Sequence, residues 1–264
     1  MSSNCILERV ASTKSTNDDL LARWRAGELI DPVARIAQVQ TAGKGRAGRR
    51  WVSKLEDSLC FSLAFPLNRR PSELSGLSLV MGLATISGIA KALDLHEDDL
   101  FQQGLRLKWP NDLLHNGAKL GGILIEGGQT QAQDPTWMIV GLGLNLANAT
   151  SIEQSLSSES TVATLDQLLP TSSVMPDIEW LWIKLVESLE THLSEFDRHG
   201  FNHFQSAWSH WDAFYGQAIC ISGQGQEPLT GISNGVDETG ALLIQQADTL
   251  LTVYAGDVSL RAQS

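Results

Sequence analysis

The chain contains little cysteine. Its 3 cysteines, Cys5, Cys60 and Cys220, are odd in number and far apart in 264 residues. This spacing fits neither a disulfide framework nor a metal cluster, so we expect reduced thiols in a cytoplasmic protein. No uncharged apolar run approaches about 18 residues, the length that a membrane helix needs. The first twenty residues also lack an apolar run behind a basic patch, so we expect neither a membrane span nor a signal peptide.

Basic residues are also scarce. The 19 Lys and Arg residues face 30 Asp and Glu residues, and the net charge of −11 argues against nonspecific binding of nucleic acid by the whole chain. Sixteen of the basic residues lie in the segment 1–126. Four of these, Lys44, Arg46, Arg49 and Arg50, fall within seven positions that contain no acid. This cluster predicts an anion-binding loop in an otherwise acidic protein.

The periodicity predicts helices and strands in an α+β order. Ser15-Thr16-Asn17 followed by two acids is typical of a helix start, and the helix would run to Gly27. Further helices are predicted over 74–93, 177–196 and 201–214. Strands are predicted over 34–39, 58–65, 105–109, 120–126 and 137–146. Because several strands adjoin without an intervening helix, we expect a mixed, mainly antiparallel sheet, with the last two strands paired.

The pattern changes after Gly216. Short β-type runs at 218–221, 229–232, 241–244 and 251–254 are separated by Gly- and Asp-rich turns, which is typical of a small antiparallel barrel. We therefore predict two domains, residues 1–215 and 216–264. The segment 147–160 is rich in Ser, Ala, Asn and Glu, and we expect it to be mobile.

The basic cluster lies in the segment from Gly43 to Trp51, which matches G-x-G-x-x-G literally. A dinucleotide-binding loop would lead directly into an apolar helix, whereas here Arg49-Arg50-Trp51 and another strand follow, which disfavours that interpretation. An ordinary basic surface loop is the plain alternative. Glycines, however, let backbone N–H groups approach a ligand, and guanidinium groups bind phosphate or carboxylate bidentately. We expect the empty loop to repel itself, to be disordered, and to close over an anion.

Three further segments combine polar groups with strand ends, namely 108–112 (Lys-Trp-Pro-Asn-Asp), 119–126 (Lys-Leu-Gly-Gly-Ile-Leu-Ile-Glu) and 141–145 (Gly-Leu-Gly-Leu-Asn). Each also has an ordinary interpretation, respectively a turn, a solvent-facing lysine and close strand packing. The alternate glycines Gly141 and Gly143 predict a slot in which a flat group lies against the strand. Asn145 at its end could bind a purine edge or a ribose.

Together these segments resemble the ordered motifs of biotin–protein ligases. The resemblance rests on Ser15-Thr16-Asn17, Gly43-Lys44-Gly45-Arg46 with Arg49 and Trp51, 108–112, 119–123 and 141–145, and it extends to the C-terminal Ser259-Leu260-Arg261. It covers about residues 10–261. It implies a class II synthetase-like catalytic domain with a small C-terminal SH3-like β-barrel, in the monofunctional type without a DNA-binding domain.

The resemblance also implies an activity and its residues. The enzyme would form biotinyl-5′-AMP from biotin and ATP with Mg²⁺, and would transfer biotin to a lysine of a biotin carboxyl carrier protein. The implied biotin-binding residues are Ser15, Thr16, Asn17, Gln40, Lys44, Gly45, Arg46, Lys119 and Gly122. The implied ATP- and adenylate-binding residues are Arg46, Arg49, Trp51, Lys108, Asn111, Asp112, Lys119, Asn145 and Arg261. The implied catalytic residues are Lys119, Arg46, Arg49 and Asp112, with Asp112 also as the Mg²⁺ ligand.

Three alternatives remain at this point. A lipoate–protein ligase would share the fold and the reaction class. A transcriptional regulator that binds biotinyl-AMP would need a DNA-binding domain, and the 14 residues before Ser15 are too few for one, so we expect no DNA partner. An inert biotin-binding module would not need the basic loop or Lys119. The family usually has Arg where this chain has Lys44, which cannot bind bidentately. A homodimer is compatible with the sequence.

Overall fold

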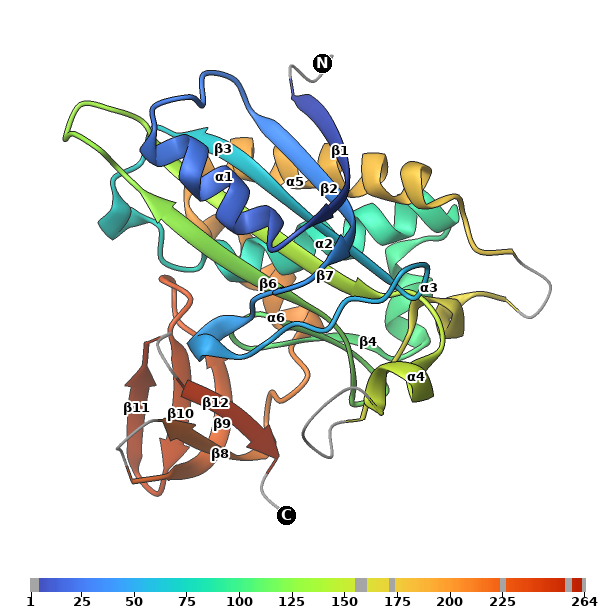
Figure 1. Ribbon diagram of the computed structural model, residues 1–264. Helices are drawn as coiled ribbons and strands as arrows, with labels where there is room; N and C mark the ends of the chain where they lie inside the picture. Colours follow the sequence, from blue (N-terminus) through green and yellow to red (C-terminus); the bar gives the residue numbers. More distant parts are fainter. Residues whose placement is uncertain (1–4, 155–160, 171–173, 224–226, 255–257, 263–264) are drawn as a thin grey trace.

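The computed structural model describes residues 5–154, 161–170, 174–223, 227–254 and 258–262. Its larger part is built on a seven-stranded sheet in the order β1-β2-β3-β7-β6-β5-β4 (Figure 1). The strands are β1 (Ile6–Thr13), β2 (Val33–Gln40), β3 (Ser58–Leu67), β4 (Leu105–Lys108), β5 (Asp112–His115), β6 (Ala118–Gly128) and β7 (Thr136–Asn145). Only β1 and β2 run parallel, and the other neighbours are antiparallel. The predicted mixed, mainly antiparallel sheet is therefore confirmed.

Helices cover both faces of this sheet. The long helices α2 (Leu77–Leu93) and α5 (Ile178–His199) pack together on one face, and α1 (Thr16–Arg25) lies on the other (Figure 1). The two long helices approach closely because Gly88 has no side chain. A Cβ atom there would lie 2.9 Å from the Cα atom of Leu185. The main core forms between these helices and the sheet, where Phe61 and Trp182 are almost fully buried.

Capping residues set the starts of α1 and α5 where the sequence predicts them. The Ser15 hydroxyl accepts a hydrogen bond from the backbone N–H of Asp18, at 3.4 Å, and Asp18 and Asp19 occupy the first turn. The Asp177 carboxylate accepts from the N–H groups of Glu179 and Trp180 at the start of α5. The start of α1 therefore fixes the positions of the residues on either side of Ser15.

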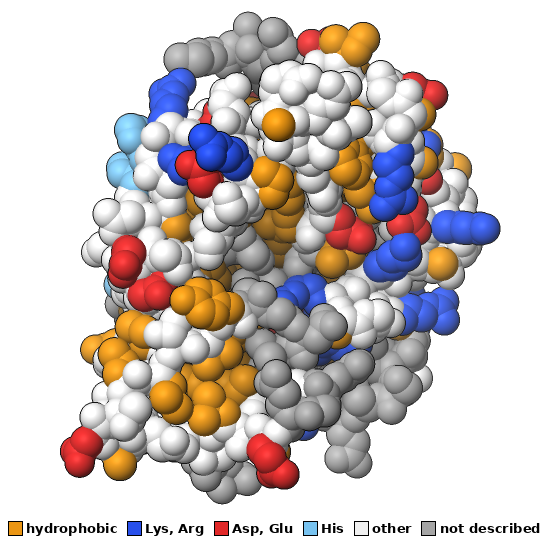
Figure 2. All heavy atoms as spheres, turned by 90° about the vertical axis from the view of Figure 1, so that its left-hand side faces the viewer, with side chains coloured by type: hydrophobic (Ala, Val, Ile, Leu, Met, Phe, Trp, Pro, Cys, Tyr) orange, Lys and Arg blue, Asp and Glu red, His pale blue; other side chains and the backbone are white. Residues whose placement is uncertain are grey.

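The C-terminal part is a five-stranded antiparallel sheet in the order β11-β10-β9-β8-β12. Its strands are β8 (Ala218–Gly223), β9 (Leu229–Val236), β10 (Leu242–Gln246), β11 (Thr249–Val253) and β12 (Val258–Ala262). It packs against the larger part, since the indole N–H of Trp109 donates to the carbonyl of Gly240 at 3.1 Å and the Ser75 hydroxyl donates to the carbonyl of Thr239 at 2.7 Å. The face drawn in Figure 2 carries a cluster of hydrophobic side chains over this sheet.

Several elements differ from the sequence-based predictions. The strands β1 and β5 and the helix α3 (Glu97–Gln102) were not predicted, because β1 is a half-exposed edge strand without clean alternation and the other two are short. The predicted helix over 201–214 is a 3₁₀ turn, Phe201–Phe204, followed by α6 (Gln205–Trp211). Within the segment predicted to be mobile, α4 (Ala149–Glu153) is helical, and residues 155–160 lie outside the described residues. No helix in the described part of the chain is both long and apolar enough to cross a membrane.

Asp212 lies where α6 leads into the C-terminal sheet, and its carboxyl group is largely buried. One oxygen accepts from the N–H of Phe214 at 2.9 Å, and the other, Oδ2, has no hydrogen-bond partner among the described residues. Burial raises the pKa of Asp212 to about 6, against the opposing effect of the Phe214 N–H. The folded protein therefore holds this proton more tightly than the unfolded chain does.

This shift predicts a pH-dependent stability. A raised acid pKa stabilises the folded state at low pH, and that stability is lost as pH rises from the unfolded value of 3.8 through about 6. We expect the wild type to lose about 3 kcal/mol relative to Asp212→Asn over this window. Urea unfolding of both proteins from pH 4 to pH 8 measures the difference. A difference that stays constant with pH would show that Asp212 titrates at its ordinary pKa.

Candidate active site

One cavity of about 890 Å³ lies between the N-terminus of α1, the loop after β2, the strands β3, β6 and β7, and the C-terminal sheet. Every site residue predicted from the sequence lines this cavity. These residues are Ser15, Thr16, Asn17, Gln40, Lys44, Gly45, Arg46, Arg49, Trp51, Lys108, Asn111, Asp112, Lys119, Gly122, Asn145 and Arg261. The structure thus brings together residues separated by up to 246 positions in the chain, from both sheets.

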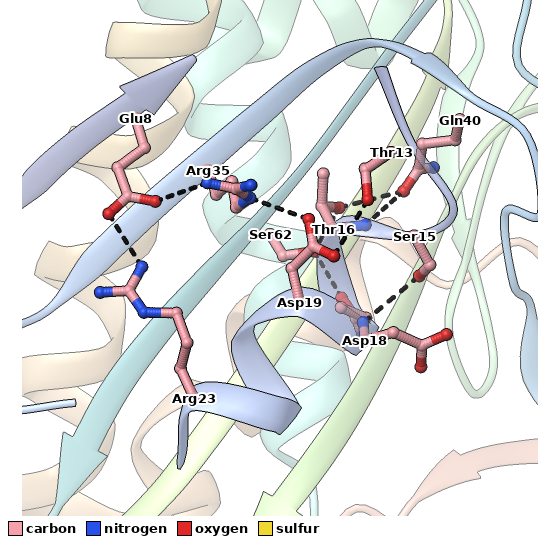
Figure 3. A network of polar contacts seen from close by, with 11 residues as sticks. Glu8, Thr13, Ser15, Thr16, Asp18, Asp19, Arg23, Arg35, Gln40 and Ser62 are labelled. Atoms are coloured by element: carbon pink, nitrogen blue, oxygen red, sulfur yellow. Dashed lines mark hydrogen bonds and ion pairs between the residues drawn. The ribbon is translucent and has the colours of Figure 1, made fainter. Parts of the chain in front are cut away.

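One end of the cavity has a floor of neutral hydrogen-bonding groups. The side-chain carbonyl of Gln40 accepts from the backbone N–H of Thr16 at 2.7 Å and lies 3.1 Å from its hydroxyl (Figure 3). The Thr16 hydroxyl lies 2.7 Å from that of Ser62, which in turn donates to Asn17 Oδ1 at 2.5 Å. Thr16, Asn17 and Ser62 are all buried. Such a floor suits a small ligand with both N–H and C=O groups.

Two members of this polar set were missed by the sequence analysis. Ser62 is the one hydroxyl in the apolar run 59–67 of β3, and Glu126 ends the charge-free part of β6, where its carboxylate accepts from Asn17 Nδ2 at 3.0 Å. A polar residue at a buried strand position was the only signal available. Which side chain it meets depends on strand register, since Ser62 lies opposite Gly141 on β7.

An ionic network holds α1 against β1 and β2 behind this floor (Figure 3). Arg35 bridges Glu8 and Asp19, at 2.8 and 2.9 Å, and Glu8 also pairs with Arg23 at 2.8 Å. The second oxygen of Asp19 accepts from the Thr13 hydroxyl at 2.9 Å. These partly buried groups fix the position of the helix start that carries Thr16 and Asn17.

The basic loop is a short hairpin. Gly45 N–H donates to the carbonyl of Arg49 at 2.7 Å, and Trp51 N–H donates to the carbonyl of Gly43 at 2.9 Å. Gly43 is required there, because a Cβ atom would lie 2.7 Å from the carbonyl oxygen of Trp51. The loop thus has a defined conformation in this structure, and its closure over an anion stays a prediction.

Two cations of this loop contact neighbouring elements. The Lys44 ammonium lies 2.5 Å from a carboxylate oxygen of Asp18, and Arg46 Nη1 donates to Asn111 Oδ1 at 3.2 Å. The charges of Lys44 and Arg46 are thereby turned toward separate acceptors on neighbouring elements, which reduces repulsion within the loop. The Lys44–Asp18 pair also joins the loop to α1, a role for which lysine needs no bidentate geometry.

The turn after β4 is held rigidly against β6. Its Trp109–Pro110 peptide bond is cis. The Asn111 side chain donates to the carbonyl of Ile123 at 2.8 Å, while the N–H of Ile123 donates to the carbonyl of Asn111 at 2.9 Å. These two bonds fix Asn111 and the adjacent Asp112 at the cavity wall.

The opposite end of the cavity concentrates positive charge around one carboxylate. Lys119 Nζ lies 2.6 Å from Asp112 Oδ1. Burial lowers the pKa of Lys108, and Asp112 opposes that shift. Three further cations lower the same pKa through their charges, namely Lys119, Arg261 and Arg49. Because one carboxylate faces so many cations, this end of the cavity is suited to an anion.

The glycine slot on β7 is occupied by the protein's own side chains. A Cβ atom on Gly141 would lie 2.3 Å from Asn17 Oδ1, and one on Gly143 would lie 2.4 Å from the ring of Trp51. The flat group predicted to lie on this strand is therefore the Trp51 indole in this structure. Asn145 uses its amide nitrogen to donate to the carbonyls of Lys119 and Ala163, at 3.1 and 3.2 Å, so it also braces the start of β6.

The Trp51 contact predicts the effect of filling the slot. We expect Gly143→Ala to lower the free energy of unfolding by about 1–3 kcal/mol, because the indole must move away from the new methyl group. In a Trp51→Ala background the same substitution meets no ring and should cost little. Urea unfolding of the wild type, both single variants and the double variant measures this coupling. Additive effects would contradict the contact.

Comparison with known proteins shows consistent relatives along the whole chain. Residues 9–145 match the Biotin/lipoate A/B protein ligase family, and residues 215–261 match the Biotin protein ligase C terminal domain. The chain is 33% identical to the bifunctional ligase/repressor BirA of Escherichia coli, over 94% of this chain and 72% of that protein. It is 31% identical to the biotin–[acetyl-CoA-carboxylase] ligase of Mycobacterium tuberculosis, over 96% of this chain and 88% of that protein.

A solved structure resembles the whole fold. The biotin protein ligase from Aquifex aeolicus in complex with biotin and ATP superposes with a TM-score of 0.75 at 25% identity, covering 98% of this chain and 99% of that one. These relatives place the chain among the ligases that activate an acid as an adenylate, and its hydrogen-bonding floor joined to a cation-rich end agrees with that class. The chain belongs to the family of biotin protein ligases, which form biotinyl-5′-AMP and transfer biotin to a lysine of a carrier protein.

Proposed function

We propose that this cavity activates biotin with MgATP and that its two ends bind different parts of the substrates. The ureido ring of biotin would lie against Thr16, Gln40 and their neighbours, and the phosphates would lie at the cation-rich end. This proposal is supported chiefly by one observation. A single cavity joins the neutral floor at Thr16 to the Lys119–Asp112 pair. Biotin has the matching shape, because a neutral polar head and a carboxylate stand at opposite ends of one small molecule.

Electrostatics dominate the first chemical step. The biotin carboxylate attacks the α-phosphorus of ATP, a P–O bond forms, and pyrophosphate leaves. Two anions must approach each other, so preorganised cations lower the barrier. We assign this role to Lys119, with Arg46 and Arg49 on the loop, while Lys108 and Arg261 extend the positive field toward the departing pyrophosphate. The remaining assigned biotin contacts, from Lys44, Gly45 and Gly122, line the same cavity.

The protein supplies few oxygen ligands for a metal of its own. Among the described residues no group of three or more His, Cys, Asp or Glu side chains is placed to hold a metal ion. Mg²⁺ would therefore enter as MgATP, held mainly by phosphate oxygens and water, with Asp112 as the one protein carboxylate at hand. When phosphates reach Lys119, its pairing with Asp112 would weaken, which frees that carboxylate for the metal.

In the second step the amine of a carrier lysine attacks the acyl carbon of biotinyl-5′-AMP, an amide forms, and AMP leaves. The incoming amine must be neutral to attack, and Asp112 is the nearest carboxylate to orient it or accept its proton. Trp51 and the basic hairpin would keep water from the mixed anhydride. Adenine would stack on Trp51, near Asn145, after the indole leaves Gly143.

The acceptor protein, the cellular compartment and the domain roles are proposed from the same family membership. The acceptor would be a biotin carboxyl carrier protein, and the reaction would take place in the cytoplasm, in keeping with the 3 widely separated cysteines of the sequence. We assign residues 1–215 to the catalytic domain and 216–264 to an SH3-like barrel. A homodimer stays a prediction that sedimentation analysis can test.

Transfer of label tests this proposal directly. Purified protein would be incubated with radiolabelled biotin, MgATP and a biotin carboxyl carrier domain, and in parallel with labelled lipoate. We expect ATP-dependent labelling of the carrier with biotin alone. Transfer of lipoate instead would redirect the assignment to a lipoate ligase, and tight biotin binding without transfer of either label would reject the ligase mechanism.

A further inference from the structure

The polar floor has fewer protons than contacts. Three oxygen–oxygen contacts run in a row, from Gln40 Oε1 to the Thr16 hydroxyl (3.1 Å), from there to the Ser62 hydroxyl (2.7 Å), and on to Asn17 Oδ1 (2.5 Å). The two amide oxygens at the ends only accept, so the two hydroxyl groups supply the only protons. One of the three contacts must therefore lack a hydrogen.

Glu126 decides that the contact between Ser62 and Asn17 holds a hydrogen. Its carboxylate accepts from Asn17 Nδ2 at 3.0 Å, so the amide of Asn17 must turn its oxygen toward Ser62. Ser62 then gives its proton to Asn17, so Thr16 has one proton for two acceptors, Ser62 Oγ and Gln40 Oε1. In either case Thr16 Oγ1 receives no hydrogen bond from Ser62, and its lone pairs stay available.

This arrangement makes the floor an acceptor. Thr16 Oγ1 presents a lone pair that Ser62 does not use, and a ligand N–H placed at the cavity wall would donate to it. Glu126 itself does not line the cavity. We propose that Glu126 is a positioning residue that fixes the direction of hydrogen bonding along Asn17, Ser62 and Thr16, so that the floor selects a ligand bearing an N–H donor. The inference rests on the proposed function, in which the ureido group of biotin reaches this floor.

The space for this relay is built into the sheet. Ser62 on β3 lies opposite Gly141 on β7, and any side chain at 141 would collide with the Asn17 amide. Asn17 is 3% exposed and Ser62 is fully buried, so water cannot easily replace either partner. The direction set at Glu126 is therefore transmitted to Thr16 through buried groups.

Replacing Glu126 by glutamine keeps the size of the side chain but no longer fixes the direction of hydrogen bonding. In Glu126→Gln the new amide can donate as well as accept, so Asn17 can turn over, Ser62 can donate to Thr16, and Thr16 can donate to Gln40. We expect biotin affinity, measured by titration calorimetry, to fall about tenfold. Glu179→Gln is the matched control, because Glu179 pairs with Arg9 on the surface, and it should leave affinity unchanged.

Two analogues separate positioning from simple loss of structure. In each, one ureido N–H of biotin is replaced by a ring oxygen. For the analogue that lacks the N–H facing Thr16, we expect wild type and Glu126→Gln to bind equally, within about twofold. An equal loss with biotin and both analogues, or no loss with biotin, would overturn the proposal.

Exchanging the carboxylate at 126 with the amide at 17 should restore biotin affinity. In the double variant Asn17→Asp with Glu126→Gln, the carboxylate at 17 can only accept from Ser62 and from the new amide, which restores the original direction. We expect its biotin affinity to exceed that of Glu126→Gln, whereas affinity no better than the single variant would count against the relay. Wild type that fails to bind biotin would instead reject the proposed function, so the two failures are distinguishable.

Discussion

Replacing Lys119 by alanine is expected to reduce the rate of biotinyl-5′-AMP formation by about two to three orders of magnitude. The ammonium group is the cation paired most closely with Asp112, at 2.6 Å, and it is where we place the biotin carboxylate and the α-phosphate. Its removal also takes away the cation closest to Asp112, whose negative charge then repels an incoming triphosphate more strongly. Pyrophosphate release at saturating biotin and ATP measures the effect.

The control for this prediction is another paired lysine. Lys184 on α5 lies 2.9 Å from Glu187, outside the cavity, so Lys184→Ala removes a charge of the same type without touching the proposed site. We expect it to keep the wild-type rate, because exposed ion pairs contribute about 0–1 kcal/mol. Comparable rates for Lys119→Ala and wild type would place the chemistry elsewhere in the cavity.

Local sequence was sufficient for most of the cavity. Its walls come from short contiguous segments, such as 43–51 and 108–112, in which glycine, proline and capping residues dictate the local backbone. The cap at Ser15 fixes the start of α1, and the long apolar periodicity fixes α2 and α5. A residue inside such a segment reaches the cavity whenever the segment does.

The remaining parts depend on register between distant strands. Ser62 belongs to the floor only because β3 places it opposite Gly141, and a shift by one residue would have turned it to the other face. The ionic network around Arg35 likewise requires β1 to lie parallel beside β2, and no local sequence pattern predicts that pairing. The slot on β7 was predicted from the local spacing of its glycines. That Asn17 and Trp51 fill it could not be predicted, because they come from distant parts of the chain.

Replacing Trp109 is expected to have a large effect on stability, because this residue joins the active-site turn to the C-terminal sheet. Its side chain is 1% exposed, and its indole N–H donates to the carbonyl of Gly240 at 3.1 Å. Trp109→Ala would leave a large cavity beneath the turn and an unpaired carbonyl across the interface. We expect the free energy of unfolding to fall by about 3–5 kcal/mol.

Trp180 supplies a matched comparison on α5. Its indole N–H also donates to a backbone carbonyl, that of Ala92 at 3.2 Å, but the residue is 48% exposed. Trp180→Ala therefore removes the same hydrogen-bonding group with far less buried surface, and should cost about 1 kcal/mol. Urea unfolding of both variants measures the difference. Equal losses would mean that the indole hydrogen bond, rather than burial, provides the stability at Trp109. A large loss at Trp109 accompanied by a raised KM for ATP would show that the C-terminal sheet, acting through this one side chain, holds Lys108 and Asn111 in position for the nucleotide.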